Sequence, residues 1–107
     1  MSELSLIVAR MRPGDSEQVA ELFARSDQTE LPALVGVRRR TLFTFHDLYF
    51  HLIEADAAVA ERVAEVRTHP LFQEINEGLL PFIQPYSPSW RSPADAMARS
   101  FYQWTRP

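Results

Sequence analysis

Two runs of β-forming residues separated by only two polar residues constrain this chain more than any other sequence feature. Residues 35–45 and 48–53 are rich in Val, Phe, Tyr and Thr, and only His46 and Asp47 lie between them. A connection of two residues between such runs is typical of a tight β-hairpin. The turn also determines the register, and with it the face of the sheet on which each side chain lies.

This register places basic and titratable side chains on one sheet face. Leu42 is opposite His51 and Arg40 is opposite Ile53, so Arg40 and His51 become diagonal neighbours, and Arg38 is expected on the same face. A histidine transfers protons near neutral pH, and a guanidinium stabilises an oxygen on which negative charge develops. The pair therefore suits enolate chemistry. A structural interpretation also stays open, with Arg40 solvated at a strand edge and His51 hydrogen-bonded in the interior.

The residues before the hairpin predict a strand, a helix and a loop. A short apolar run over residues 4–11 is typical of a strand and is followed by a Pro-Gly turn. Asp15 is expected to cap a helix, with a glutamine three residues on as its capping-box partner. Val19, Leu22 and Phe23 have the spacing of a buried helical stripe. The polar, proline-containing segment that follows is expected to be a loop.

After the hairpin, the sequence predicts two helices and a last strand. Asp56 is expected to cap the first helix, the pre-proline residue His69 to end it, and Pro70 to begin the second helix. Residues 81–93 contain four prolines and predict an irregular loop. The aromatic-rich segment 97–105 is expected to form the last strand.

The predicted order is α+β: the ferredoxin-like βαββαβ order with its second helix split in two. Right-handed connections put all helices on one face of a four-stranded antiparallel sheet. The other face is left uncovered, and an aromatic sheet face in water is an association surface. We therefore predict that two copies pair their sheets as a dimeric α+β barrel. The aromatic residues expected on these strands are Phe45, Tyr49, Phe50, Phe101 and Trp104.

Composition excludes several other classes of protein. A chain of 107 residues has room for one domain, over residues 1–107, and a net charge of −3 without a broad basic face argues against a nucleic-acid partner. The absence of cysteine excludes disulfides and thiolate chemistry. No run approaches the ~20 apolar residues of a membrane span, and no signal peptide is recognisable, so we expect a cytoplasmic protein without a membrane partner. The eleven basic residues are all arginine, which indicates an actinobacterial genome rich in GC.

The remaining polar residues give one further candidate. Asp27 immediately follows the first helix and is preferred to Glu30 as an acidic group beside a pocket. His46 and His51 lie on opposite faces of a strand, which argues against a shared metal ion. His69 is expected to cap or pack at a helix boundary.

Six segments carry a resemblance to a known family. They are residues 29–32 (TELP), 36–40 (GVRRR), 42–56 (LFTFHDLYFHLIEAD), 69–76 (HPLFQEIN), 85–86 (PY) and 101–105 (FYQWT). In these segments the chain resembles the tetracenomycin F2 cyclase family, and actinobacterial spore-pigment cyclases are similar in the same places. The segments are distributed from residue 29 to residue 105, over most of the chain.

The resemblance implies a homodimeric barrel whose pocket binds a poly-β-ketone intermediate from a type II polyketide synthase. It also implies regioselective aldol closure with loss of water, a lyase-type activity that uses no metal or organic cofactor. Arg40 and His51 match pocket residues of the family, and Asp27 matches the acidic residue beside them. Ser26 stands where the tetracenomycin enzyme has a histidine, so a mechanism that needs this histidine does not transfer.

We therefore expect Arg40 to hold a carbonyl or enolate oxygen while His51 moves protons, with Asp27 as the third catalytic residue. Two alternatives stay open: a cofactor-free anthrone oxygenase on the same barrel, and a non-catalytic subunit that binds the synthase or its acyl carrier protein and steers cyclisation. The residues expected to bind substrate are Ser26, Leu42, Phe50, Ile53 and Trp104.

Overall fold

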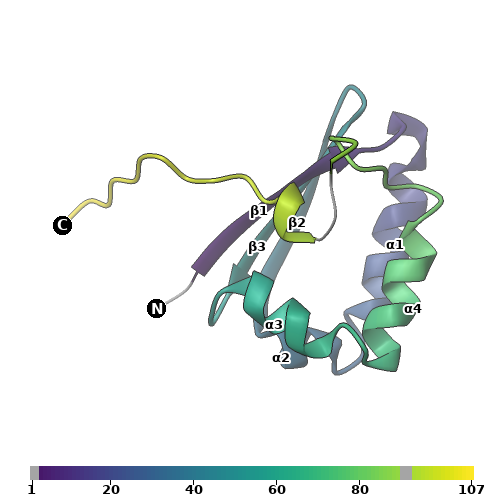
Figure 1. The fold of residues 1–107 in the computed structure, drawn as a ribbon, viewed down its shortest axis with the longest axis horizontal. Coiled ribbons are helices and arrows are strands. Elements are labelled where there is room, and N and C mark those ends of the chain that lie inside the picture. The colour runs from purple at the N-terminus through teal and green to yellow at the C-terminus, as the bar shows by residue number, and fades with distance from the viewer. Residues whose placement is uncertain (1–2, 90–92) are drawn as a thin grey trace.

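The structure, a computed structural model, describes residues 3–89 and 93–107. Its three strands form one antiparallel sheet in the order β1-β3-β2. All four α-helices lie on one side of this sheet, with α1 and α4 side by side and α2 and α3 near one end (Figure 1). The elements in chain order are β1 (Glu3–Arg10), the 3-10 helix η1 (Pro13–Asp15), α1 (Ser16–Ser26), α2 (Leu31–Val35), β2 (Val37–Phe45), β3 (Leu48–Ala55), α3 (Val59–Val66), α4 (Pro70–Leu79) and the 3-10 helix η2 (Pro93–Ala96).

The β2–β3 hairpin has the predicted register. Leu42 pairs with His51, and Arg40 pairs with Ile53. His46 adopts a φ of 55°, in the left-handed region that histidine tolerates better than bulky or β-branched residues do. The two-residue turn therefore aligns the strands as the sequence predicts.

The beginning of β2 departs from the prediction. The register shifts between Val37 and Arg39, which leaves Arg38 as the extra residue of a β-bulge. Its guanidinium lies 3.6 Å from the carboxylate of Asp56, and both side chains are more than half exposed. The bulge breaks the alternation that was expected to put Arg38 on the face of Arg40, and Arg38 lies exposed beside Asp56 instead.

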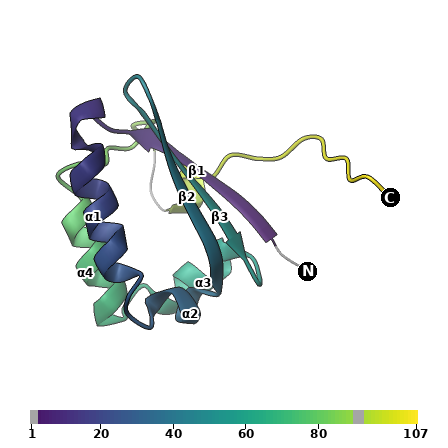
Figure 2. The ribbon, with the colours of Figure 1, turned by 180° about the vertical axis from the view of Figure 1, so that it is seen from behind.

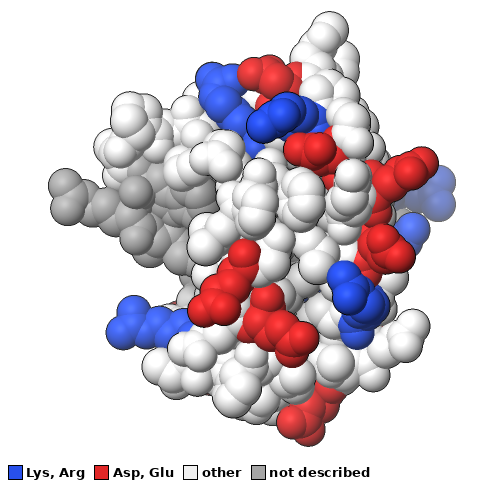
Figure 3. Space-filling view, turned by 90° about the vertical axis from the view of Figure 1, so that its right-hand side faces the viewer, with Lys and Arg blue, Asp and Glu red and all other residues white. Residues whose placement is uncertain are grey.

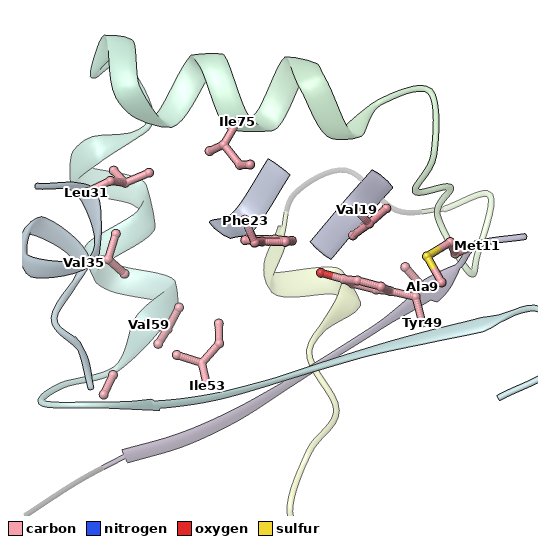
Figure 4. Packing of buried hydrophobic residues seen from close by; sticks show 11 residues of the cluster. Ala9, Met11, Val19, Phe23, Leu31, Val35, Tyr49, Ile53, Val59 and Ile75 are labelled. Atoms are coloured by element: carbon pink, nitrogen blue, oxygen red, sulfur yellow. The ribbon is translucent and has the colours of Figure 1, made fainter. Parts of the chain in front are cut away.

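The core lies between the sheet and the helices. Every second residue of β3 from Tyr49 to Ala55 is buried, as the period of two requires. Tyr49 and Phe50, both expected on the strands, therefore lie on opposite faces: Tyr49 faces the helices and Phe50 the uncovered side. The buried apolar residues, most of which Figure 4 labels, are Ala9, Met11, Val19, Phe23, Leu31, Val35, Tyr49, Ile53, Ala55, Val59 and Ile75.

The helix α1 has the predicted stripe but not the predicted cap. Val19 and Phe23 are buried, and Leu22 packs against the core from a half-buried position. Asp15 makes no capping hydrogen bond with its side chain, because it is the last residue of the 3-10 helix η1 and has a helical backbone conformation. The predicted capping box is therefore wrong.

The split of the second helix is confirmed. The helices α3 and α4 are separate, and Pro70 is the first residue of α4. Proline is favourable there because the N–H of a first helical residue makes no intrahelical hydrogen bond. His69 caps this helix, since its Nδ1 accepts a hydrogen bond from the N–H of Leu71 at 3.1 Å. Asp56 does not cap α3, because the residue that precedes this helix is Ala58.

The short helix α2 occupies part of the segment that was expected to be a loop. Thr29 stabilises its start, because its Oγ1 accepts a hydrogen bond from the N–H of Leu31 at 3.2 Å. Pro32 lies in the first turn, where proline is tolerated. Gly36 ends the helix with a φ of 83°, the left-handed conformation that glycine adopts most readily.

The fourth strand of the predicted sheet is not formed. Met97 makes a single bridge to Ile7 of β1, and the N–H of Ala98 donates to the carbonyl of Leu6 at 2.7 Å. The bridge lies on the edge where the ferredoxin-like order places a fourth strand. Beyond it the chain has no regular secondary structure and extends away from the body of the molecule (Figures 1 and 2). The aromatic side chains of this segment are exposed: Phe101, Tyr102 and Trp104.

The second face of the sheet is mainly apolar, and none of the described helices covers it (Figures 1 and 2). The pairing of the strands puts eight apolar side chains on this face, which we call the open face. They are Leu4, Leu6 and Val8 of β1, Phe43 and Phe45 of β2, and Leu48, Phe50 and Leu52 of β3. Phe43 and Phe45 are 50% and 61% exposed, so the open face is an apolar surface in contact with water.

The outer side of the helical layer has a different character. Figure 3 shows this side of the molecule, where acidic and arginine side chains are scattered among uncharged residues. Mixed charges of this kind are typical of a solvated surface. Within the described ranges, no helix is long and apolar enough to cross a membrane.

Candidate active site

A cavity of about 290 Å³ lies between the sheet and the helical layer. This volume is near the lower end of ligand-binding pockets, which begin at roughly 300 Å³. Its walls are mainly apolar and come from all four α-helices, the sheet and the segment after α4. The polar residues that line it are Ser26, Arg40, Tyr49, His51, Asn76 and Gln84.

Arg40 connects all the residues that were predicted to be catalytic. Its Nε lies 3.2 and 3.1 Å from the two carboxylate oxygens of Asp27, and its Nη2 donates to Oδ1 at 2.8 Å. Its Nη1 lies 2.8 Å from Nε2 of His51. The guanidinium also lies over the ring of Phe23, 4.7 Å from its centroid. Contacts with three partners, Asp27, His51 and Phe23, therefore fix the orientation of the cation.

Three separate elements bring this cluster together. Asp27 follows the last residue of α1, and its N–H donates to the carbonyl of Phe23 at 2.7 Å, which anchors it at the helix end. Arg40 and His51 come from neighbouring strands in the predicted diagonal arrangement. The side chain of Arg40 is 15% exposed and that of Asp27 is 37% exposed, so the ion pair lies at the rim of the cavity.

The hydrogen bond from Arg40 determines the protonation state of His51. A guanidinium has no acceptor atom, so Arg40 donates and Nε2 of His51 accepts, which puts the imidazole proton on Nδ1. Burial, together with the positive charge of Arg40, lowers the pKa of His51 from 6.5 to about 3. The imidazole is therefore neutral at physiological pH, and its only lone pair available for proton transfer is bound to Arg40.

The predicted substrate-binding residues are only partly brought to this cavity. Ser26 and Ile53 line it. Leu42 lies on the same sheet face but lines a smaller neighbouring cavity of about 140 Å³. Phe50 lies on the open face, because it alternates with His51 along β3, and Trp104 lies in the exposed C-terminal segment. The structure therefore does not place Phe50 or Trp104 at the cavity of this chain.

Two aromatic residues of the site were missed. Phe23 was expected only to pack in the helical stripe, yet it contacts both Arg40 and His51. Tyr49 was expected only as one of the aromatic residues on the strands. The predicted register already contained the signal for Tyr49, because residues two apart on a strand share a face and Tyr49 precedes His51 by two. Glu30, the other acidic candidate, is exposed near His69.

The fold and the cavity define a class of protein. It is a small α+β protein with helices on one face of an antiparallel sheet, and its apolar cavity has a cation and a neutral imidazole on its wall. Such a site suits an apolar molecule that carries oxygen atoms, since Arg40 binds oxygen and the rest of the wall binds hydrocarbon.

Comparison with known proteins identifies the family within this class. Residues 3–105 match the family model of polyketide synthesis cyclases. The chain is 52% identical over 107 residues to tetracenomycin F2 cyclase from Streptomyces glaucescens, which covers 100% of this chain and 98% of the relative. It is 48% identical over 103 residues to polyketide synthase CurG from Streptomyces cyaneus, which covers 95% of this chain and 96% of the relative. The chain belongs to the polyketide synthesis cyclase family.

A solved structure supports the same assignment. The structure of tetracenomycin F2 cyclase from Streptomyces glaucescens, described as a type-II polyketide cyclase, matches this chain with a TM-score of 0.92. The match covers 98% of this chain and 99% of the solved chain. The predicted family resemblance and the predicted α+β class are both confirmed.

Proposed function

We propose that this chain is an aromatic polyketide cyclase that acts as a single domain over residues 1–107. It closes a ring in a poly-β-ketone from a type II polyketide synthase by intramolecular aldol condensation, and loss of water makes the ring aromatic. Family membership supports the substrate class. The observation that carries the chemistry is the Asp27–Arg40–His51 cluster at the wall of an apolar cavity.

Most of the rate enhancement comes from the shape of the cavity. A methylene between two carbonyl groups is already acidic, and a flexible poly-β-ketone cyclises without help into several products. Holding the chain so that one carbon faces one carbonyl supplies part of the ~7 to 11 kcal/mol that ideal positioning provides. Apolar wall residues such as Ile53, with Leu42 beside them on the same sheet face, restrict the conformations of the chain. Ser26, whose side chain lines the cavity, is the proposed contact for a substrate oxygen near the rim.

Arg40 and His51 have separate roles in the reaction: Arg40 binds the substrate oxygen, and His51 transfers the proton. A substrate carbonyl oxygen that accepts a hydrogen bond from Nη1 of Arg40 takes the place of Nε2 of His51. The released Nε2 then removes a proton from the adjacent methylene, and the electron pair moves to the oxygen as an enolate, which the guanidinium stabilises. The enolate carbon attacks the second carbonyl, and the new alkoxide recovers the proton from His51. Asp27 keeps Arg40 in place through these steps.

The low pKa of His51 is consistent with this role. In the empty site, Arg40 stabilises the neutral imidazole by its charge and its hydrogen bond. A developing enolate places a negative charge beside the imidazole, which favours the protonated form and raises the pKa of His51. The base is therefore strengthened at the stage of the reaction that needs it. The proposal uses no metal or organic cofactor.

The chain is proposed to act as a homodimer in the cytoplasm. The open face supports this, because a contiguous apolar sheet face in water gains stability when a second layer covers it. Two open faces packed together form the α+β barrel that the sequence predicts. Synthase subunits or the acyl carrier protein are the proposed source of the substrate.

The decisive experiment is product analysis with the purified chain and a partially cyclised aromatic polyketide intermediate, in buffer with a chelator and without oxygen. One regioisomer that has lost water is the expected product. A product that has gained oxygen and lost two hydrogens, formed only when dioxygen is readmitted, would instead identify an anthrone oxygenase. Turnover only in the presence of the synthase would identify a non-catalytic subunit that steers cyclisation.

A further inference from the structure

The phenol of Tyr49 is a buried polar group that the proposed mechanism does not use. The residue is 3% exposed and lies on the helix-facing side of β3, two residues before His51. Figure 4 shows its ring lying over the sheet with the hydroxyl oxygen on the side of Phe23 and away from Met11. Its ring also packs against the edge of His51, with 6.1 Å between centroids. Tyr49 therefore belongs to the same wall as the catalytic cluster.

This phenol has no hydrogen-bond partner among the described residues. Buried tyrosine hydroxyls usually have one, because an unmet donor in an apolar interior is unfavourable. Within the same described ranges, no side-chain nitrogen or oxygen that is sealed from solvent lacks a partner. The oxygen of Tyr49 must therefore reach space that water can enter, and it points toward Phe23, which lines the main cavity. The phenol is open to a partner from within the cavity.

The surroundings keep this phenol protonated. Burial raises the pKa of Tyr49 well above its ordinary value of 10.0, and the nearby charge of Arg40 opposes this shift only in part. A protonated phenol donates a hydrogen bond, and carbonyl or enolate oxygens accept one. The cavity thus presents two donors from its sheet wall, the guanidinium of Arg40 and the hydroxyl of Tyr49.

The ring of Tyr49 lies between two cavities and lines both of them. On one side is the main cavity with His51, and on the other is the smaller cavity of about 140 Å³, which Leu42 and Val19 also line. The aromatic ring is therefore the wall that a bound chain meets at this end of the site.

We propose that Tyr49 determines the register of the bound polyketide: its phenol donates a hydrogen bond to a second substrate oxygen, and its ring limits how far the chain extends. This inference rests on the proposed function. In a poly-β-ketone the oxygens recur on every second carbon, so a single contact at Arg40 leaves the chain free to bind shifted by one unit. A second donor at a fixed position selects one of these alignments and thereby the carbon that reacts. Tyr49 is thus a specificity-determining residue, distinct from the groups that move protons.

The test compares Tyr49→Phe with Tyr86→Phe. Tyr86 is exposed, lies against Arg10 and is not among the residues that line the cavity, so its substitution serves as the matched control. Binding of the hydroxyanthraquinone emodin is measured by fluorescence quenching, and the products from a linear or partially cyclised poly-β-ketone are measured by chromatography with mass spectrometry. We expect Tyr49→Phe to weaken emodin binding about five- to tenfold, the effect of one lost hydrogen bond, and to convert one product into several regioisomers.

The outcomes separate this inference from the proposed function. Turnover by the wild-type chain, with unchanged emodin affinity and unchanged products in Tyr49→Phe, overturns the role of Tyr49 alone. Absence of turnover overturns the proposed function, while the ratio of emodin affinities still decides whether Tyr49 donates to a ligand oxygen. A chain that binds no emodin and turns over no substrate contradicts both.

A second measurement needs no substitution of Tyr49. Fluorotyrosine labelling gives three fluorine signals, from Tyr49, Tyr86 and Tyr102. Emodin is expected to shift the signal of Tyr49 and to leave the two exposed tyrosines unchanged. A signal from Tyr49 that does not move at saturating emodin would overturn the inference even if Tyr49→Phe fails to fold.

Discussion

The two faces of the sheet come from the same strands and have opposite character. On the helix-facing side, β3 presents Tyr49 and His51, polar groups that a folded layer of helices surrounds. On the open face, β3 presents Phe50 and Leu52, and no helix covers them. The covered face holds polar groups because His51 has Arg40 as its hydrogen-bond partner and Tyr49 lines the cavity. The open face presents mainly apolar side chains, which suits association with a second apolar layer.

We therefore propose that the covered face carries the residues of the reaction and that the open face forms the contact between two copies. A substitution on the covered face should therefore change turnover with little effect on oligomeric state. A substitution on the open face should change oligomeric state first. The predictions that follow test this division, and each uses a control residue from another surface of the molecule.

Replacement of Arg40 is expected to have the largest effect. Arg40→Ala removes the donor that stabilises the enolate oxygen and leaves Asp27 without its partner. We expect turnover to fall by about 100- to 1000-fold, the usual effect of losing one group that stabilises a developing oxyanion. Arg62→Ala, on the exposed surface of α3, is the control and should retain full activity. Folding is checked by circular dichroism, and a loss smaller than threefold in a folded Arg40→Ala protein would remove Arg40 from the mechanism.

An acidic residue on the open face should separate the two copies. In Phe43→Asp each copy loses an apolar contact and buries a charge, and in a twofold dimer the change occurs twice. We expect the dimer dissociation constant to rise on the order of 100-fold or more, measured by size-exclusion chromatography with light scattering. Ala24→Asp, on the exposed surface of α1, should leave the dimer intact.

The same experiment can contradict the proposed roles of the two faces. A wild-type chain that is monomeric at all concentrations would contradict the assignment of the open face to assembly. A Phe43→Asp monomer with full turnover would show that the covered face is complete within one chain. A monomer that loses turnover as severely as Arg40→Ala would show instead that the site requires the partner subunit.

The buried histidine of the covered face predicts how stability depends on pH. The pKa of His51 is about 3 in the folded chain and near 6.5 when unfolded, so the unfolded state binds more protons as the pH falls below 6.5. The stabilising contribution is complete above pH 6.5 and is lost progressively down to about pH 3. By pH 5 the loss from this one group is about 2 kcal/mol.

Urea unfolding at pH 7 and pH 5 measures this contribution. Other groups also titrate in this range, so the relevant quantity is the difference between wild type and His51→Gln, which lacks the titration. His46→Asn is the control, because it removes the exposed turn histidine and keeps a residue that tolerates the left-handed conformation. Equal pH dependence in wild type and His51→Gln would show that His51 is not held neutral by its surroundings.

Much of this arrangement could be predicted from local sequence patterns. The turn at His46 sets the hairpin register, and the register places Arg40 and His51 together. Asp27 joins them because the first helix ends beside the hairpin, and the family resemblance pointed to this residue. These are predictions from periodicity and from a short connection, which are strong local signals.

Other features depend on contacts between distant segments and were not predicted. The β-bulge at Arg38 and the helix α2 result from how the chain enters the sheet, and a proline in the first turn does not prevent a helix. The last strand was expected because its residues are aromatic, yet a strand forms only where a neighbour accepts its hydrogen bonds. Beyond the bridge of Met97 to Ile7, the described residues 99–107 do not pair with the edge of β1.

The smallest expected effect concerns the residue that joins the covering helices to the sheet. Gly36 ends α2 with a φ of 83°, and its carbonyl accepts a hydrogen bond from the N–H of Asp56 at 2.9 Å. A methyl group at this position would meet Asp56 only at ordinary contact distance, 3.8 Å, so the cost of Gly36→Ala is conformational and not steric. We expect a loss of about 1 kcal/mol in the free energy of unfolding, measured by urea denaturation.

Gly14→Ala is the control, because its φ is not positive and nothing lies near the added methyl group. If both substitutions have the same small effect, the left-handed turn at Gly36 does not constrain the chain between α2 and β2. A loss of stability well above 1 kcal/mol in Gly36→Ala alone would show that the bulge and α2 form as one cooperative unit.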